Sequence, residues 1–198
     1  MSSPTQVLII RHGEKLGDPK TDTDGGPHLS IQGSARATAL PSLFVPITPQ
    51  LDCKLDHEAK KFKGIYQPVP LKGKAARFLE PNFIFATKAS KHSNRPVETV
   101  TPASVALSLA INDAFADNDS DITKMANTIL QNTSFASKVV LICWHHGKIP
   151  EVAKALGVSN PPKWDGKVFD RVWQITFPNG KAKLDDLPQM LLYGDSAK

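Results

Sequence analysis

Basic side chains and histidines gather at the ends of three apolar segments of the sequence. Arg11-His12-Gly13 directly follows the apolar residues 6–10, and His145-His146-Gly147 directly follows residues 139–144. A third apolar segment, residues 83–87, leads into a stretch that contains Lys88, Lys91, His92 and Arg95. Arginine can hold an oxyanion through two parallel hydrogen bonds, and a neutral imidazole can act as a nucleophile. The gathering of these residue types at three such positions therefore favours a ligand site over packing.

The three segments need a common scaffold if their side chains are to meet. Apolar runs of strand length alternate with helix-like segments at about 30–40, 96–111 and 122–131. Such alternation is typical of a mostly parallel central sheet with helices on both faces, a three-layer α/β/α fold. Open sheets of this kind place their ligand sites at the carboxyl ends of the strands. We therefore expect the three basic strand ends to converge at one edge.

Local signals predict where the elements begin and end. Ser30 is the expected N-cap of the first helix, which Pro41 ends, and Pro96 suits the start of the second helix. A fourth strand is expected within residues 168–177 and a short edge strand at 190–193. Five prolines between residues 41 and 80 predict a largely irregular excursion. We interpret residues 1–198 as a single domain that carries this excursion.

The net charge of +5 is concentrated in one segment of that excursion. Residues 54–77 hold seven basic and two acidic residues, so the rest of the chain is neutral. The simplest interpretation is a solvated surface loop. The functional alternative is attraction of an anion, and Lys60, Lys61 and Lys63 would supply a second anionic subsite if the excursion folded over the functional edge. Nucleic-acid binding is not favoured, because the segment holds only Phe62 and Tyr66 as stacking residues.

The composition argues against several other classes of protein. With 40% hydrophobic and 22% charged residues the chain is globular, and no apolar run approaches the length of a membrane span. The first residues lack the basic and apolar regions of a secretion signal. Cys53 and Cys143 make no disulfide framework, so a reduced, cytoplasmic setting is expected. No metal and no cofactor is expected, because the histidines lack the usual zinc spacing.

Taken in order along the chain, the motifs resemble those of the histidine phosphatase superfamily, which has the phosphoglycerate-mutase-like fold. Arg11-His12-Gly13-Glu14 is similar to the signature of that family, and the segment from Leu29-Ser30 through Gly33 to Arg36-Ala37 is similar to its second motif. Arg95, followed by Thr99, resembles the second arginine, which opens a helix. His146-Gly147 resembles the second histidine after a strand, and the Trp144-His145-His146 form resembles a branch with Trp-Glu-His there. The resemblance covers the core and is weakest at residues 41–80.

The resemblance implies a phosphomonoester hydrolase that works through a phosphohistidine on His12 and needs no metal. The phosphate would be bound by Arg11, Gly13, Arg95 and His146, and His146 would also take part in catalysis. The leaving group needs a general acid, which much of the family draws from a carboxylate between the second arginine and the second histidine. The candidates in that interval are Glu98, Asp113, Asp117, Asp119 and Asp121, and we favour Asp117. Further candidate contacts are Glu14, Lys15, His92 and His145.

Two other functions share this predicted pocket. A mutase of the phosphoglycerate mutase type would retain the phosphorylated enzyme and transfer the group back to its intermediate. A non-catalytic module would keep the fold and bind a phosphorylated ligand or protein, although the presence of both arginines and both histidines favours catalysis. In each case the expected partner is a small phosphoester or a phosphorylated substrate. The sequence leaves the substrate and the oligomeric state open.

Overall fold

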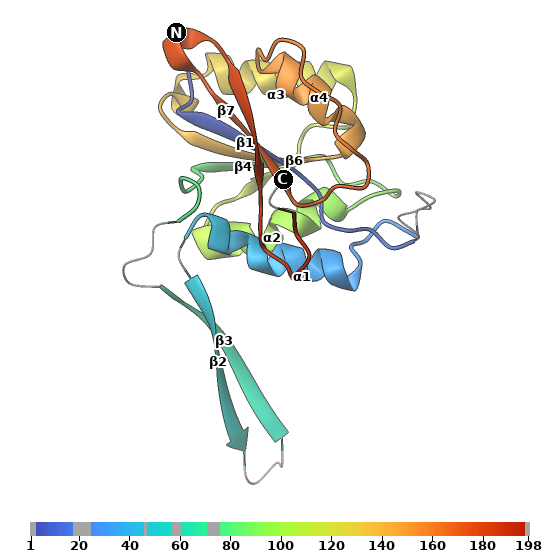
Figure 1. Ribbon diagram of the computed structural model, residues 1–198, viewed down its shortest axis with the longest axis vertical. Helices are drawn as coiled ribbons and strands as arrows, with labels where there is room; N and C mark the ends of the chain where they lie inside the picture. Colours follow the sequence, from blue (N-terminus) through green and yellow to red (C-terminus); the bar gives the residue numbers. More distant parts are fainter. Residues whose placement is uncertain (1–2, 18–24, 46, 57–60, 71–75, 197–198) are drawn as a thin grey trace.

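A computed structural model describes residues 3–17, 25–45, 47–56, 61–70 and 76–196; for 47–56 and 61–70 it describes the backbone. Its centre is a six-stranded sheet in the order β5-β4-β6-β1-β7-β8 (Figure 1). The parallel strands are β1 (Gln6–Arg11), β4 (Phe83–Ala86), β5 (Ile111–Asn112) and β6 (Val139–Trp144). β7 (Arg171–Thr176) and β8 (Lys183–Pro188) continue the sheet in antiparallel register. The predicted, mostly parallel sheet is confirmed.

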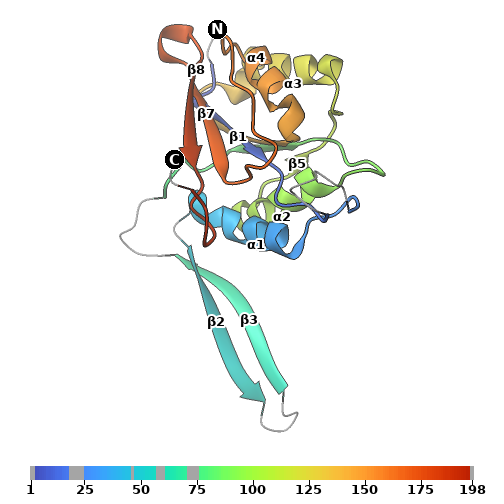
Figure 2. The same ribbon diagram turned by 45° about the vertical axis from the view of Figure 1, so that its right-hand side comes forward.

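Helices cover both faces of this sheet and make the predicted three layers. α1 (Ile31–Ala39) and α2 (Arg95–Leu107) lie on one face, and α3 (Asp119–Gln131) and α4 (Ile149–Ala155) lie on the other (Figures 1 and 2). Alternate residues of a strand point to opposite faces, so β1, which is buried throughout, contributes to two cores. Val7 and Ile9 pack in the core that contains α3 and α4 residues, and Leu8 and Ile10 pack in the core that contains Val100 and Ala103 of α2.

Short 3-10 helices join several of these elements. They are η1 (Leu40–Leu43), η2 (Thr133–Phe135), η3 (His146–Lys148) and η4 (Pro178–Gly180). None of the helices within the described ranges is both long and apolar enough to cross a membrane.

Helix boundaries follow from local backbone chemistry. The Ser30 hydroxyl accepts a hydrogen bond from Gly33 N at 3.1 Å, so the predicted cap of α1 is confirmed. α2 ends at Leu107, four residues before its predicted end, because Ser108 adopts the left-handed conformation with φ of 55°. α3 begins at Asp119, before its predicted start, because the Asn118 side chain accepts from Asp121 N and caps the helix.

The fourth strand lies within its predicted range as β7, but the prediction of an edge strand at 190–193 is wrong. Met190 has a φ of 54°, and the Asp195 carboxylate accepts hydrogen bonds from the backbone nitrogens of Leu191 and Leu192, so this segment turns. The edge is formed by β8 instead, whose residues are all exposed or partly exposed. An edge strand pairs on one side only, which is why such a polar sequence can form one.

The prediction of a largely irregular excursion at 41–80 is also wrong. It contains an antiparallel hairpin of β2 (Ile47–Asp56) and β3 (Lys61–Pro70), which is separate from the main sheet. Pro49 lies opposite Pro68 in the register. Both strands of a two-stranded ribbon are edge strands. Proline, which has no backbone N–H, is tolerated at those positions of an edge strand where the N–H would not donate a hydrogen bond to the other strand. The prolines therefore do not exclude pairing, as the sequence interpretation assumed.

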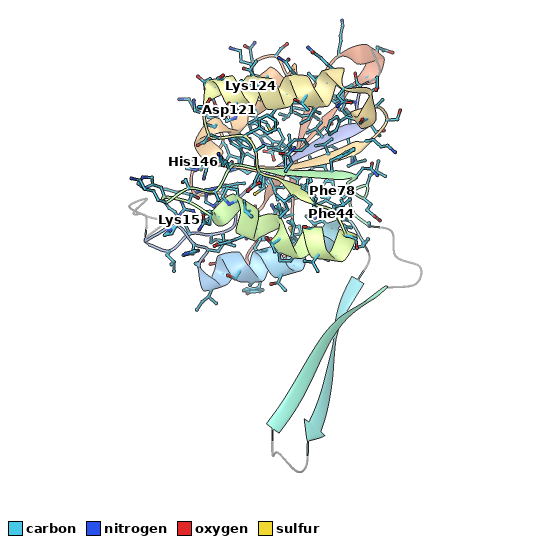
Figure 3. All side chains as sticks on the ribbon, turned by 180° about the vertical axis from the view of Figure 1, so that it is seen from behind. Lys15, Phe44, Phe78, Asp121, Lys124 and His146 are labelled. Carbon is cyan, nitrogen blue, oxygen red and sulfur yellow. The ribbon has the colours of Figure 1, made fainter. Side chains whose placement is uncertain are left out.

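The hairpin extends away from the main sheet, beyond the layer of α1 and α2 (Figures 1 and 2). Its two ends meet near the end of α1 and the start of β4, where Phe78 N donates to Leu43 O at 2.9 Å. Figure 3 shows Phe44 and Phe78 beside this root, and Lys15 and His146 on the other side of the molecule. The hypothesis that the excursion folds over the functional edge is therefore wrong for its backbone. The lysines on which that hypothesis rested have side chains outside the described part of the structure.

Candidate active site

The three basic strand ends converge at the carboxyl edge of the sheet. β6 lies between β1 and β4, and Arg11, the last residue of β1, is the register partner of Trp144, the last residue of β6. The ladder continues one residue further on each side, because His12 N donates to Trp144 O and Thr87 N donates to Cys143 O, both at 3.2 Å. The segments after the three strands therefore begin side by side, as the sequence predicted.

His12 is buried, with 2% of its surface exposed, and its two ring nitrogens have different environments. Nδ1 lies 2.7 Å from the carbonyl oxygen of Gly13. A carbonyl can only accept, so this contact places the ring proton on Nδ1 and leaves a lone pair on Nε2. Burial, followed by the positive charge of Arg11, holds the pKa of His12 well below 6.5. The ring is therefore neutral near pH 7 and has a nucleophilic nitrogen.

Arg11 is held by the loop that precedes β7. Its Nη1 donates to Gly166 O at 2.6 Å and to Val168 O at 3.2 Å. The guanidinium carbon lies 3.6 Å from the centre of the Phe169 ring, within the range of a cation–π contact. With only 1% of its surface exposed, this side chain is a fixed positive charge directly beside His12.

A second buried arginine opens α2. Arg95 is 5% exposed, and its Nη1 donates to the carbonyl oxygen of Gly26. Thr99, one turn later, donates through Oγ1 to Arg95 O at 2.7 Å and accepts from Gly13 N at 2.8 Å. Thr99 thus ties the first turn of α2 to the loop after β1. Because Thr99 lies one turn after Arg95, the same turn of α2 supplies the buried arginine and the contact with the loop after β1.

Two glycines let α1 approach the same loop. A Cβ on Gly33 would overlap the carbonyl oxygen of Glu14 and come within 2.8 Å of its nitrogen. A Cβ on Gly13 would lie 2.9 Å from Gly33 O. Both positions therefore exclude any larger residue unless the backbone moves. The glycine in the second sequence motif is explained by this close backbone contact.

The structure places Glu14 against Arg36. Their carboxylate and guanidinium groups form an ion pair at 2.7 Å, and Arg36 also pairs with Asp195 at 2.8 Å. Burial opposes the charge of Arg36, but the hydrogen bonds from Asp195 and Glu14 outweigh it and raise the pKa of this guanidinium. Since Arg36 is 3% exposed, the group is a buried ionic cluster that joins α1, the loop after β1 and the C-terminal segment. It gives Glu14 an evident structural role.

Four of the carboxylates considered as general acids also have structural partners or exposed positions. Glu98 accepts from Leu29 N at 2.9 Å and pairs with His28. Asp119 pairs with Lys148 at 2.7 Å. Hydrogen bonds from Ala116 N and Lys124 lower the pKa of Asp121, whose neighbours lie within its own loop and helix. Asp113 is exposed beside β5.

Asp117, the favoured candidate, lies in contact with two residues at the end of β6. Its Oδ1 accepts from the indole nitrogen of Trp144 at 2.7 Å, and its Oδ2 lies 3.1 Å from His145 Nδ1. The other ring nitrogen of His145, Nε2, lies 3.1 Å from Ser93 Oγ. The His145 ring meets the His12 ring edge-on, with 5.5 Å between their centres.

The histidine that touches His12 is thus His145, whereas the motif comparison assigned the second histidine to His146. His146 opens η3 and faces the loop before β7, where a Cβ on Gly166 would lie 3.1 Å from its Nε2. The signal for His145 lies in the strand register. His12 and His145 each directly follow the paired strand ends Arg11 and Trp144, so they are neighbours across the sheet.

The remaining candidates, Lys15 and His92, lie outside the helices and strands of the main fold. Lys15 is partly buried, and its backbone forms a bridge with Leu29. His92 is exposed, and its backbone nitrogen donates to Ser90 Oγ at 3.2 Å.

Within the described ranges, no group of three or more His, Cys, Asp or Glu residues could hold a metal ion.

Comparison with known proteins identifies the fold. No protein-family model and no curated protein sequence matches the chain. Among solved structures, phosphoglycerate mutase from Bacillus anthracis is 12% identical with a TM-score of 0.57, and the match covers 94% of this chain and 93% of that one. The protein histidine phosphatase SixA complexed with tungstate is also 12% identical, with a TM-score of 0.52 and coverage of 93% and 97%. Mycobacterial glucosyl-3-phosphoglycerate phosphatase is 11% identical, with a TM-score of 0.52 and coverage of 91% and 97%.

These solved structures share the phosphoglycerate-mutase-like fold. The chain has this fold, as the motif resemblance implied.

Proposed function

We propose that the protein is a phosphomonoester hydrolase that forms a phosphohistidine on His12. The observation that carries this proposal is the state of that side chain: a buried, neutral imidazole with its proton on Nδ1, beside two buried arginines. Arginine side chains neutralise a phosphate that would otherwise repel a nucleophile. The neutral ring supplies the lone pair that attacks.

In the proposed reaction, Arg11 and Arg95 hold the phosphate oxygens, and Gly13 allows the substrate to approach the backbone closely. His146 provides a further donor at the rim. His12 Nε2 attacks phosphorus as the bond to the leaving oxygen breaks, and water then hydrolyses the phosphohistidine. Most of the catalysis comes from placing fixed positive charge where the transferred phosphoryl group carries its negative charge.

A mutase is the second candidate, because one of the solved structures with this fold is a phosphoglycerate mutase. The two activities differ in the fate of the phosphohistidine. Release of inorganic phosphate without an isomerised product supports hydrolysis, and formation of an isomer of the substrate supports the mutase.

The test is to trap the intermediate. The wild-type protein and a His12→Ala variant are mixed with a ³²P-labelled phosphomonoester, quenched in base and analysed for acid-labile label. We expect label on His12 and loss of both label and turnover in the variant, whereas His28→Ala, at an exposed histidine, keeps both. Turnover by the wild-type protein without acid-labile label would contradict the phosphohistidine. Phosphate binding without turnover across a panel of phosphoesters would favour a non-catalytic binding module.

A further inference from the structure

A chain of polar side chains connects the loop before α3 to the nucleophile. Asp117 accepts a hydrogen bond from Trp144 and lies 3.1 Å from His145 Nδ1, and His145 contacts both Ser93 and the ring of His12. The substrate phosphate must occupy the space next to His12 Nε2. His145 therefore lies beside the space that the phosphate would occupy.

The surroundings of His145 suit a ring that carries two protons. A carboxylate oxygen of Asp117 lies 3.1 Å from Nδ1, an ion-pair distance without hydrogen-bond geometry, and the Ser93 hydroxyl oxygen, which can accept, lies 3.1 Å from Nε2. An imidazolium at this position would have an anion beside it and an acceptor for its Nε2 proton. The contrast with His12 is clear, because His12 has a carbonyl acceptor on one nitrogen only and is almost completely buried. The surroundings of His12 therefore suit a neutral ring, whereas those of His145 suit a ring that donates a proton.

The position of the carboxylate is fixed by a group outside the reaction. The Trp144 indole donates to Asp117 Oδ1 at 2.7 Å, and Trp144 is itself fully buried at the end of β6. The second oxygen is thereby directed at His145. Of the other charged groups near this pair, Arg11 and Arg95 act on His12, and Lys148 at the start of α4 is paired with Asp119 while also attracting Asp117. Asp117 is therefore the anion placed to balance a positive charge on His145.

We propose that His145 is the general acid of this site and that Asp117 is a positioning residue which holds it. The inference rests on the proposed function. As His12 Nε2 bonds to phosphorus and the bond to the ester oxygen breaks, the Nε2 proton of His145 passes to that oxygen, and the leaving group departs as a neutral alcohol. His145 is then neutral and keeps the proton on its own Nδ1, beside the Asp117 carboxylate.

The second half of the reaction runs through the same nitrogen. Neutral His145 accepts a proton at Nε2 from the water that attacks the phosphohistidine. The N–P bond breaks, inorganic phosphate leaves, and both histidines return to their starting states. No other proton donor is needed, so the carboxylate predicted from the sequence acts through His145 instead of protonating the substrate itself.

Dependence on the leaving group tests this assignment. A poor leaving group such as a simple alkoxide needs protonation, whereas 2,4-dinitrophenolate leaves without it. For His145→Gln, we expect kcat on an alkyl phosphate to fall by roughly 10²–10⁴ and kcat on 2,4-dinitrophenyl phosphate to fall far less. Equal losses on the two substrates in a variant with wild-type thermal stability would overturn the proposal.

Asp117→Asn tests the positioning role, and Asp119→Asn is its matched control from the same segment. Removing the carboxylate destabilises the protonated form of His145, so the descending limb of the pH–rate profile with the alkyl phosphate should move to lower pH. The control should keep the wild-type profile. An unchanged profile in Asp117→Asn would count against the pair.

Failure of this inference can be told from failure of the proposed function. The labelling of His12 by an activated, labelled phosphate ester does not require a general acid. If His145→Gln still labels His12 but shows no selective loss on the alkyl phosphate, only the assignment of His145 fails. If the wild-type protein turns over the activated ester without labelling His12, the phosphohistidine mechanism fails as well.

Discussion

At the scale of single residues, the reactivity proposed for His12 comes from its surroundings. An exposed histidine is partly protonated near neutral pH and has no preferred tautomer. Here burial and Arg11 remove the charge, and the contact with Gly13 O selects the tautomer. Because the folded protein keeps this ring neutral, the free energy of unfolding should depend on pH. This dependence can be measured without knowing the substrate.

Stability should depend on pH through His12. The folded protein keeps this ring neutral, whereas the unfolded chain binds a proton as the pH falls below about 6.5, so stability falls as the pH decreases through that value towards the lower folded pKa. One such group accounts for about 1.4 kcal/mol between pH 7.5 and 5.5 if its folded pKa lies below that window. Urea unfolding at both pH values should show a smaller decrease for His12→Asn than for the wild type. An identical decrease in the two proteins would rule out this role.

At the scale of elements, the site depends on how closely α1 and α2 approach the loop after β1. Thr99 joins α2 to Gly13, and Gly33 of α1 lies against the backbone of Glu14. The Arg36 cluster then links α1 to the C-terminal segment. The residues of the sequence motifs thus form the contacts between α1, α2 and the loop after β1.

Gly33→Ala should be destabilising although alanine favours helices. In an open helix this change stabilises by about 1 kcal/mol, but here the new Cβ would overlap the Glu14 backbone, which cannot move without disturbing His12. We expect a net loss of roughly 1–3 kcal/mol, measured by urea unfolding. Gly147→Ala is the matched control, since a Cβ there meets nothing within 4 Å. Equal stabilities of the two variants would contradict the close docking of α1.

At the scale of the whole molecule, the candidate site and the root of the hairpin lie at opposite ends of the central strands. The basic strand ends share the carboxyl edge, whereas β2 and β3 leave the body near the end of α1 and the start of β4 (Figure 1). Helices that follow parallel strands bring the chain back to the amino edge, so an insertion between α1 and β4 emerges there. The hairpin therefore has no direct route to the candidate site.

Removing the hairpin should leave the chemistry intact. Replacing residues 47–74 with a short Gly-Ser linker should preserve the cooperative unfolding of the six-stranded domain, because Leu43 and Phe78 already lie together. It should also preserve kcat/KM on small aryl phosphates and on polyanionic phosphoesters alike. A selective increase in KM for the polyanionic substrates would restore the idea of a second anionic subsite in this segment.

The sequence by itself determined the scaffold and the main candidates. Apolar runs, caps and the order of strands and helices predicted the layered sheet, and the strand ends identified Arg11, His12 and Arg95 as neighbours, because parallel strands share an edge. The prolines at 41–80 led to a wrong prediction. Proline has no backbone N–H to donate, but the other residues of the segment can still pair as strands. β8 was missed because a polar edge strand lacks the apolar signal of a buried one.

Only the tertiary structure decided which histidine accompanies His12 and what the carboxylates contact. His145 and His146 are adjacent in the sequence, and only the pairing of Arg11 with Trp144 places His145 against His12. Glu14 and Asp117 likewise carry the same functional group, yet the Glu14 carboxylate contacts Arg36 and the Asp117 carboxylate contacts Trp144 and His145. The reason is physical: the role of a charged side chain depends on partners that are far away in the sequence, and folding alone brings them into contact.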